Sequence, residues 1–152
     1  MSIPVSVVRP GEGEIVLDDG ASRVRILEDG GATQSRLAVA ECVLAPLFAG
    51  PPQHRHAEHE EGFYIVSGLI RFTVGEDQHD AGPGSFVMVP VGAPHSFANP
   101  GEEAAKVLFT FTPNLYVQYF RDFANIKNRF DRDEVAEVMS RYATELATTY
   151  AG

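Results

Sequence analysis

The chain has 152 residues, a length that suits a single domain and is enough to enclose a hydrophobic core. It carries 12 basic and 21 acidic side chains, which gives a formal net charge of −9. An acidic protein is repelled by phosphate backbones and by anionic lipid surfaces. We therefore expect neither nucleic acid nor a membrane as a partner.

The cysteine content and the N-terminal residues indicate where the protein resides. A single cysteine, Cys42, excludes an intramolecular disulfide, which suits a reducing compartment. The first residues lack the apolar core of a signal peptide, and no stretch approaches the ~20 apolar residues of a membrane span. We expect a cytoplasmic protein.

Short strands separated by turn residues are predicted between residues 14 and 112. Glycine and proline punctuate the apolar runs, and Asp18-Asp19-Gly20-Ala21 is a hairpin signal. Regular short strands of this kind indicate an all-β sandwich or barrel. The predicted strands cover residues 15–17, 23–27, 37–44, 63–66, 69–74, 85–89, 95–98 and 106–111.

After residue 111 the apolar period changes to that of helices, and two are predicted, at about 113–125 and 131–147. Thr112 followed by Pro113 is a helix start, with a capping hydroxyl and a proline in the first turn. Asp131, with Glu134 three residues later, is a capping-box arrangement. The apolar stripes of both helices can pack against the barrel or a second subunit. Alternatively, the first helix, rich in tyrosine and phenylalanine, covers the mouth of a pocket. The stripes comprise Leu115, Tyr116, Tyr119, Phe120 and Phe123 in the first helix, and Val135, Val138, Met139, Tyr142 and Leu146 in the second.

Three histidines and a glutamate have spacings that favour a metal site. His54 and His56 point to one side of a strand, because residues two apart share a face. A short turn can bring Glu61 beside them, while His95 must come from another strand. Three imidazoles and a carboxylate suit a first-row divalent metal and leave coordination positions open for water or substrate. The alternative is that His54 and His56 are exposed in a polar loop and that His95 is a turn residue.

The first of two sequence blocks resembles the first motif of the cupin superfamily. That motif has a glycine, His-x-His, a gap of three or four residues, a glutamate, six residues and a glycine. His54-Arg-His56, Glu61 and Gly68 match it. One position departs from the pattern, because only three residues separate Gly50 from His54, where the family's leading glycine usually stands five residues before the first histidine.

The second block resembles the family's second motif at every position, and with the first it covers about residues 40–112. The motif is Gly, five residues, Pro-x-Gly, two residues, His, three residues, Asn. Gly84, Pro90, Gly92, His95 and Asn99 match it. The resemblance implies an all-β fold, the cupin double-stranded β-helix or jelly-roll barrel, at about residues 14–112 and followed by the two helices, with all 152 residues in a single domain.

The resemblance also implies one divalent transition metal ion per chain, bound by His54, His56, Glu61 and His95. Iron, manganese, nickel, cobalt or copper would serve a redox reaction. Zinc also fits the ligands but would not support redox chemistry. A homodimer is expected by the same resemblance.

Neighbouring polar residues are expected to have other roles. Six residues lie between Glu61 and Gly68, as the motif requires, and strand alternation would point Glu60 away from the metal. His59 and His79 are expected to be solvated turn residues. Asn99 is expected to be a turn or capping residue, and Cys42 a core residue that does not act as a nucleophile.

Apolar side chains around the ligands suggest the kind of substrate. If Glu61 points inward along its strand, Phe63 and Ile65 should do so too, and Phe97 should follow His95. An apolar wall beside the metal favours an aromatic or apolar small molecule. Each residue can equally be ordinary barrel core. The candidates for the pocket wall are Phe63, Ile65, Met88, Phe97, Phe109 and Phe111.

Three classes of function remain open. The chain looks like the small bacterial cupins related to quercetin dioxygenase, which implies a metal-dependent dioxygenase cleaving an aromatic or enol-type substrate with dioxygen. In that reaction Glu61 would accept the substrate proton. The alternatives are a non-redox isomerase or polyketide cyclase, in which the metal acts as a Lewis acid, and a non-catalytic cupin that binds a small ligand.

Overall fold

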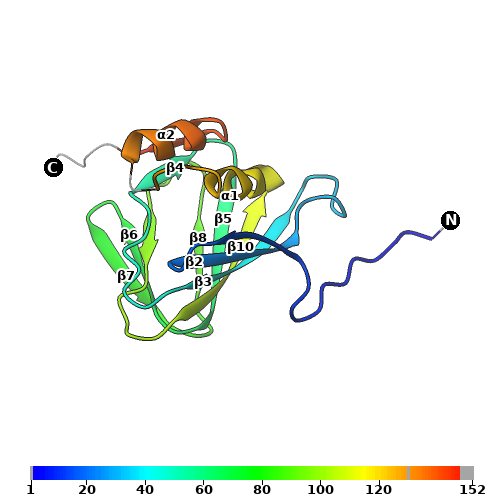
Figure 1. The fold of residues 1–152 in the computed structure, drawn as a ribbon, viewed down its shortest axis with the longest axis horizontal. Helices are drawn as coiled ribbons and strands as arrows, with labels where there is room; N and C mark the ends of the chain where they lie inside the picture. The colour runs from blue at the N-terminus through cyan, green and yellow to red at the C-terminus, as the bar shows by residue number, and fades with distance from the viewer. Residues whose placement is uncertain (1, 130, 148–152) are drawn as a thin grey trace.

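The computed structural model describes residues 2–129 and 131–147, and its strands enclose a core that the helices cover at one end (Figure 1). One layer is a six-stranded sheet with the order β1-β2-β3-β10-β5-β8, in which every neighbouring pair is antiparallel. Its strands are β1 (Glu14–Asp18), β2 (Ser22–Glu28), β3 (Ala38–Leu44), β5 (Glu60–Ser67), β8 (Phe86–Val89) and β10 (Ala105–Thr112).

The opposite layer is built from two smaller sheets joined at a pair of histidines. A three-stranded sheet has the order β7-β6-β9, and β11 pairs with β4. The backbone amides of His54 and His95 donate to each other's carbonyl oxygens at 3.0 and 2.9 Å, which links the two sheets. The expected all-β jelly roll is confirmed. The strands of this layer are β4 (His54–His56), β6 (Ile70–Val74), β7 (Asp77–Ala81), β9 (Ser96–Ala98) and β11 (Thr144–Leu146).

Alternating side chains of β5 and β10 fill the space between the layers. Phe63 and Phe109 are paired across the two strands and are both fully buried. On the other side of β10, Phe109 lies opposite Ala40 and Phe111 opposite Ala38, so small residues stand beside large rings. Apolar burial of this kind is the main stabilising contribution to the fold.

The first C-terminal helix begins after a short 3-10 turn, η1 (Asn114–Tyr116), and continues as α1 (Val117–Phe123). The expected hydroxyl cap at Thr112 is wrong, because its Oγ1 donates to Glu60 Oε2 at 2.7 Å and Pro113 takes the cap position without a side-chain hydrogen bond. This contact also shows Glu60 pointing away from the barrel interior, as expected.

The second helix, α2 (Arg132–Ser140), begins as predicted and ends earlier than expected. Asp131 caps it by accepting hydrogen bonds from the amides of Asp133 and Glu134. The chain leaves the helix through Ala143, which has φ of 49°, and β11 pairs with the open edge of β4. The backbone groups on that edge of β4 need hydrogen-bond partners, and residues 144–146 supply them by forming β11. This pairing overrides the helical pattern of the sequence.

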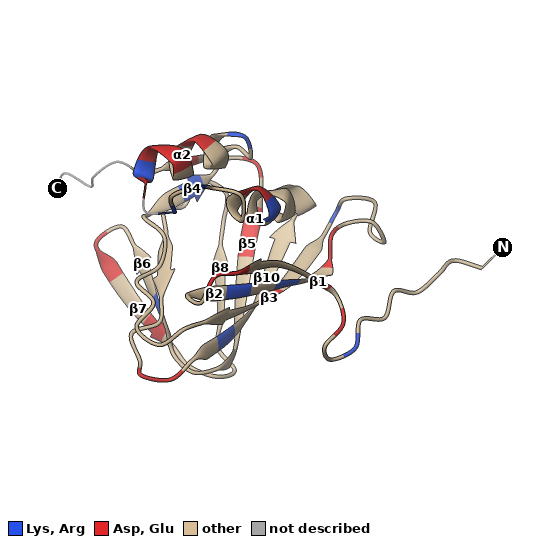
Figure 2. Cartoon of the chain, in the orientation of Figure 1, with Lys and Arg blue, Asp and Glu red and all other residues tan. Residues whose placement is uncertain are grey.

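Acidic positions lie on α2, β5 and the β6–β7 hairpin, with basic positions interspersed among the elements (Figure 2). In the part of the chain that the structure describes, no helix has the length and apolar character needed to cross a membrane.

Candidate metal centre

Four side chains from three places in the fold meet inside the barrel. His54 and His56 come from β4, Glu61 from β5, and His95 from the residue before β9. Their ligand atoms all lie within 4.8 Å of one another, and each side chain is buried. Glu61 Oε2 lies 2.9 Å from His56 Nε2 and 3.3 Å from His95 Nε2. The structure therefore brings together the four residues that the sequence proposed as ligands.

Backbone carbonyls orient two of the imidazoles. Nδ1 of His54 lies 2.9 Å from the carbonyl oxygen of Pro52, and Nδ1 of His95 lies 2.9 Å from that of Ala93. A carbonyl only accepts, so each Nδ1 must carry the proton and donate it. The Nε2 lone pairs of both rings consequently face the cluster, which is the tautomer that a metal ligand needs.

A hydroxyl orients the third imidazole. Nδ1 of His56 lies 2.7 Å from Oγ1 of Thr144 in β11, and that hydroxyl donates to the carbonyl oxygen of Tyr142 at 3.1 Å. The hydroxyl proton is thus engaged, so Thr144 accepts from His56 and leaves the Nε2 lone pair facing inward. A hydrogen-bond partner on the far nitrogen of a ligating imidazole fixes the orientation of the ring in metal sites.

The charges in the cluster also suit a metal ion. Burial would raise the pKa of Glu61, but in the metal-free protein a proton on Nε2 of His56 or His95 would donate to its carboxylate and hold that pKa well below its usual range; a bound ion would take the place of that proton. Burial, together with the neighbouring His95 and His56, lowers the pKa of His54 to about 3. A buried carboxylate beside imidazoles with inward lone pairs is the donor set of a divalent transition metal. The four residues can therefore hold one such ion.

His59 differs from its expected place in a solvated turn. It is 1% exposed, and its ring lies 4.1 Å from that of His56 and 5.0 Å from that of Tyr116, measured between centroids. Neither ring nitrogen has a hydrogen-bond partner among the described residues. The expectation is wrong because η1 folds over the β4–β5 turn and covers it. His79 is exposed, as expected, although it lies within β7.

The burial of His59 predicts an acid-sensitive fold in the metal-free protein. Burial, with a smaller effect of His56, lowers the pKa of His59 to about 4 from 6.5. The unfolded chain therefore takes up a proton first as the pH falls, and the free energy of unfolding decreases between pH 6.5 and about 4. Between pH 7 and pH 4.5, the free energy of unfolding of His59→Leu should fall by about 2–3 kcal/mol less than that of wild type. Urea unfolding at the two pH values measures both changes. Equal losses in the two proteins would contradict this assignment.

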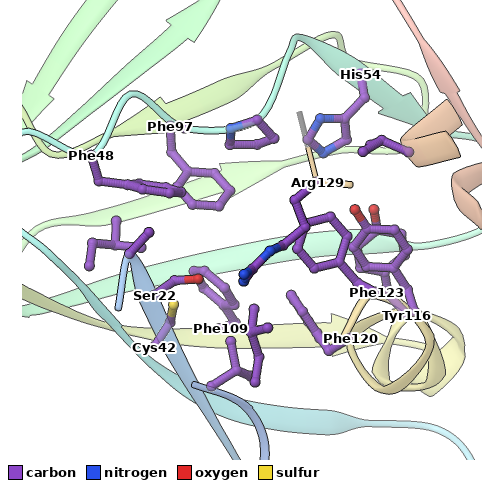
Figure 3. Close-up of a pocket in the computed structure, with 18 of the residues that line it drawn as sticks. Ser22, Cys42, Phe48, His54, Phe97, Phe109, Tyr116, Phe120, Phe123 and Arg129 are labelled. Atoms are coloured by element: carbon purple, nitrogen blue, oxygen red, sulfur yellow. The ribbon is translucent and has the colours of Figure 1, made fainter. Parts of the chain in front are cut away.

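An apolar cavity of about 260 Å³ reaches the candidate metal ligands His54 and Glu61. Figure 3 shows His54 among the side chains that line it. This volume is near the lower end of the roughly 300–1,000 Å³ of small-molecule pockets. Phe97 and Phe109, two of the expected wall residues, line it. Further aromatic side chains in its wall are Phe48, Tyr116, Tyr119, Phe120 and Phe123.

The other wall candidates lie elsewhere. Phe63, Ile65 and Phe111 are fully buried and do not line the cavity, so they are barrel core. Met88 is 51% exposed, because it pairs with Gly62 on the outer face of the β5–β8 pair. Phe86 is exposed on the same face. The homodimer expected from the sequence stays a prediction.

The C-terminal helices contribute to the cavity wall. Tyr116 precedes α1, Phe120 lies within it, and Met139 comes from α2. The interpretation that the first helix covers the pocket therefore fits the structure, and the same side chains also pack against the barrel. The sequence showed the aromatic stripe, but it did not show whether the stripe faces the pocket, the barrel or a second subunit.

Two polar residues in the cavity were missed by sequence reasoning. Asp19, from the β1–β2 turn, forms an ion pair with Arg129, from the segment between α1 and α2, and both line the cavity. The sequence marked Asp19 only as part of a hairpin turn, and no pattern marked Arg129. Cys42 also lines it, and burial raises the pKa of its thiol to about 12, so it stays a protonated core residue.

The unusual position of Gly50 has a structural reason. It adopts φ of +82°, and a Cβ placed there would lie 1.8 Å from the carbonyl oxygen of Phe97. Only glycine fits this backbone approach, which brings the turn before β4 against β9. Asn99 is a turn residue as expected, since its Nδ2 donates to Glu103 and Ala45 carbonyls and its Oδ1 accepts from the amide of Gly101.

Comparison with known proteins finds similarity to a described family over much of the barrel. Residues 40–111 match a family described as "Cupin domain". An uncharacterized protein of Streptomyces coelicolor is 38% identical over 61 residues, which are 40% of this chain and 56% of that protein. The match spans little more than half the length of that relative.

Solved structures share the fold. A sugar phosphate isomerase of the cupin superfamily from Silicibacter pomeroyi is 24% identical, with a TM-score of 0.54 over 60% of this chain and 59% of that one. KdgF of a Halomonas species is 17% identical, with a TM-score of 0.63 over 72% and 94%. The polyketide cyclase RemF of Streptomyces resistomycificus is 16% identical, with a TM-score of 0.61 over 89% and 99%. At these identities the likeness concerns the fold alone.

Proposed function

We propose that the protein is a metal-dependent enzyme acting on an aromatic or enol-type small molecule, because residues 40–111 match a cupin domain family and an aromatic cavity ends at the buried histidines. The reaction we favour is a dioxygenation of the quercetinase type. The observation that carries the proposal is the contact of the cavity with His54 and Glu61, which places a bound substrate beside the ligand cluster.

The side chains of the cavity wall favour an apolar, aromatic substrate. Phe97, Phe109 and Phe120 present apolar faces, and aromatic rings pack favourably against them. A sugar phosphate would find few polar partners in such a wall, and its desolvation would be costly. A planar aromatic molecule is therefore the better fit.

In this proposal the chain's own residues hold the ion and handle the substrate proton. A bound redox-active ion would supply the electron-transfer chemistry that dioxygen needs. As a ligand to the ion Glu61 would be ionised, and its carboxylate could accept a hydrogen bond from an enol or phenol hydroxyl and then its proton. The aromatic side chains of η1 and α1 keep water from the reacting end of the substrate.

A non-redox reaction is the second candidate. The likeness to RemF extends over 89% of this chain, beyond the family match. A cyclase or isomerase would use the same apolar cavity, with the ion polarising a carbonyl oxygen as a Lewis acid.

Oxygen consumption separates the two candidates. Protein reconstituted with iron, manganese or nickel should consume dioxygen in step with the loss of a flavonol or related enol, monitored with an oxygen electrode and by product analysis. The zinc form should be inactive, because zinc is not redox-active. Turnover that persists without oxygen and in the zinc form would contradict the dioxygenase and support the cyclase or isomerase.

A further inference from the structure

The cavity carries polar side chains at two places. His54 and Glu61 belong to the ligand cluster, whereas Asp19, Ser22 and Arg129 form a second polar group. Aromatic and aliphatic side chains form most of the wall between them. A ligand that fills the cavity therefore meets polar atoms at both ends and apolar surface along its body.

The strand register shows that the two polar groups lie at opposite ends of the six-stranded sheet. Ser22, which follows the turn containing Asp19, is aligned through β3 with Ala105 of β10. Glu61 is aligned with Phe111 of the same strand. Six residues separate these two levels of β10.

The ion pair stands at the mouth of the cavity. The Asp19 side chain is 9% exposed and that of Arg129 is 39% exposed. Asp19 Oδ1 accepts from the amides of Ala21 and Ser22 at 2.8 and 2.7 Å, so the hairpin turn fixes the carboxylate, and Oδ2 pairs with Arg129 Nη1. Figure 3 shows the Arg129 side chain reaching into the pocket.

The hydrogen-bonding capacity of the Asp19–Arg129 ion pair favours one kind of ligand group. A guanidinium has five N–H donors in a fixed fork, and the carboxylate is an acceptor with several lone pairs. Because the two charges cancel, the pair does not favour a second anion, which Asp19 would repel. A hydroxyl on an aromatic ring suits it better, since it can donate to Asp19 and accept from Arg129 at once.

We propose that the Asp19–Arg129 pair is a recognition site for a phenolic hydroxyl at the end of the substrate remote from the metal ligands. This inference rests on the proposed function, because it assumes that an enol or phenol oxygen of the same molecule lies at the ligand cluster. The substrate class is thereby narrowed to planar aromatic molecules with hydroxyl groups at both ends.

Three matched naphthalene derivatives test the proposal. 2-Naphthol has one oxygen, for the metal end only. 2,6-Dihydroxynaphthalene adds a hydroxyl at the far end, and 6-hydroxy-2-naphthoate adds a carboxylate there instead. Binding to the zinc-loaded protein is measured by isothermal titration calorimetry, so no oxidation of the ligand is involved.

Wild type should bind 2,6-dihydroxynaphthalene about tenfold more tightly than 2-naphthol, because hydrogen bonds to charged partners are the stronger ones. The double variant Asp19→Asn/Arg129→Gln removes both charges, so it should abolish this preference and leave the affinity for 2-naphthol within about twofold of wild type. Arg132→Gln, an exposed arginine of α2 outside the cavity, is the matched control and should keep the preference. Asp19→Asn, which keeps the oxygen that holds the turn, should strengthen binding of 6-hydroxy-2-naphthoate about tenfold, since Arg129 is then unpaired.

The outcomes separate this inference from the proposed function. If 2-naphthol binds and the second hydroxyl adds no affinity in wild type, the recognition site is overturned while the proposed function stands. A preference that survives in Asp19→Asn/Arg129→Gln also overturns it. If none of the three ligands binds, both the aromatic substrate class and the recognition site are overturned.

Discussion

Replacing His95 by alanine is expected to deprive the protein of its metal. His95 is fully buried and its Nε2 faces Glu61, so the variant loses one of the four inward donor atoms. The affinity for a divalent ion should fall by more than the ~10–100-fold typical of an outer-shell partner. Elemental analysis by mass spectrometry, after dialysis against a fixed free-metal concentration, measures the loss.

Two further variants make this result specific. Glu61→Gln keeps the side-chain volume and removes the charge, so it should also lose metal while retaining the far-ultraviolet circular dichroism of wild type. His79→Ala removes an exposed histidine of β7 and should keep a full equivalent of metal. Undiminished metal in both His95→Ala and Glu61→Gln would refute the ligand assignment.

The second large effect is expected from Thr144→Val, which changes no ligand. Valine keeps the shape and the β-branching that β11 requires but cannot accept the hydrogen bond from His56 Nδ1. The imidazole is then free to rotate or to change tautomer, and the metal affinity should fall about 10–100-fold. A competitive titration with a chromophoric chelator measures the change.

The matched control is Thr73→Val, a strand threonine of β6. It should leave the metal affinity at the wild-type value. An affinity of Thr144→Val within about twofold of wild type would show that the Thr144 hydroxyl does not orient the ring.

The ligand cluster could be predicted because its geometry follows from local rules. His54 and His56 share one face of a strand, and strand alternation points Glu61 inward and Glu60 outward. The two motifs fix the positions at which the chain turns: Gly68, Gly84 and Gly92 have φ of 79°, 86° and 83°. Strand alternation places His54, His56 and Glu61 on the inner face, whereas the inclusion of His95 and the choice of Glu61 over Glu60 depended on the resemblance to the two family motifs.

The surroundings of the cluster could not be predicted, because they depend on contacts between segments far apart in sequence. Thr144 reaches His56 across 88 positions, and its segment has a helical apolar pattern that pairing with β4 overrides. His59 is buried by Tyr116, which lies in another element. Likewise, Arg129 meets Asp19 only because the segment after α1 returns over the β1–β2 turn.

Anomalous diffraction from crystals of the metal-loaded protein tests directly whether the four residues bind the ion. The data are collected at the absorption edge of the bound metal. We expect one anomalous peak per chain, about 2.0–2.2 Å from Nε2 of His54, His56 and His95 and from a carboxylate oxygen of Glu61. A stoichiometrically loaded protein with no peak among these four residues would contradict the central claim.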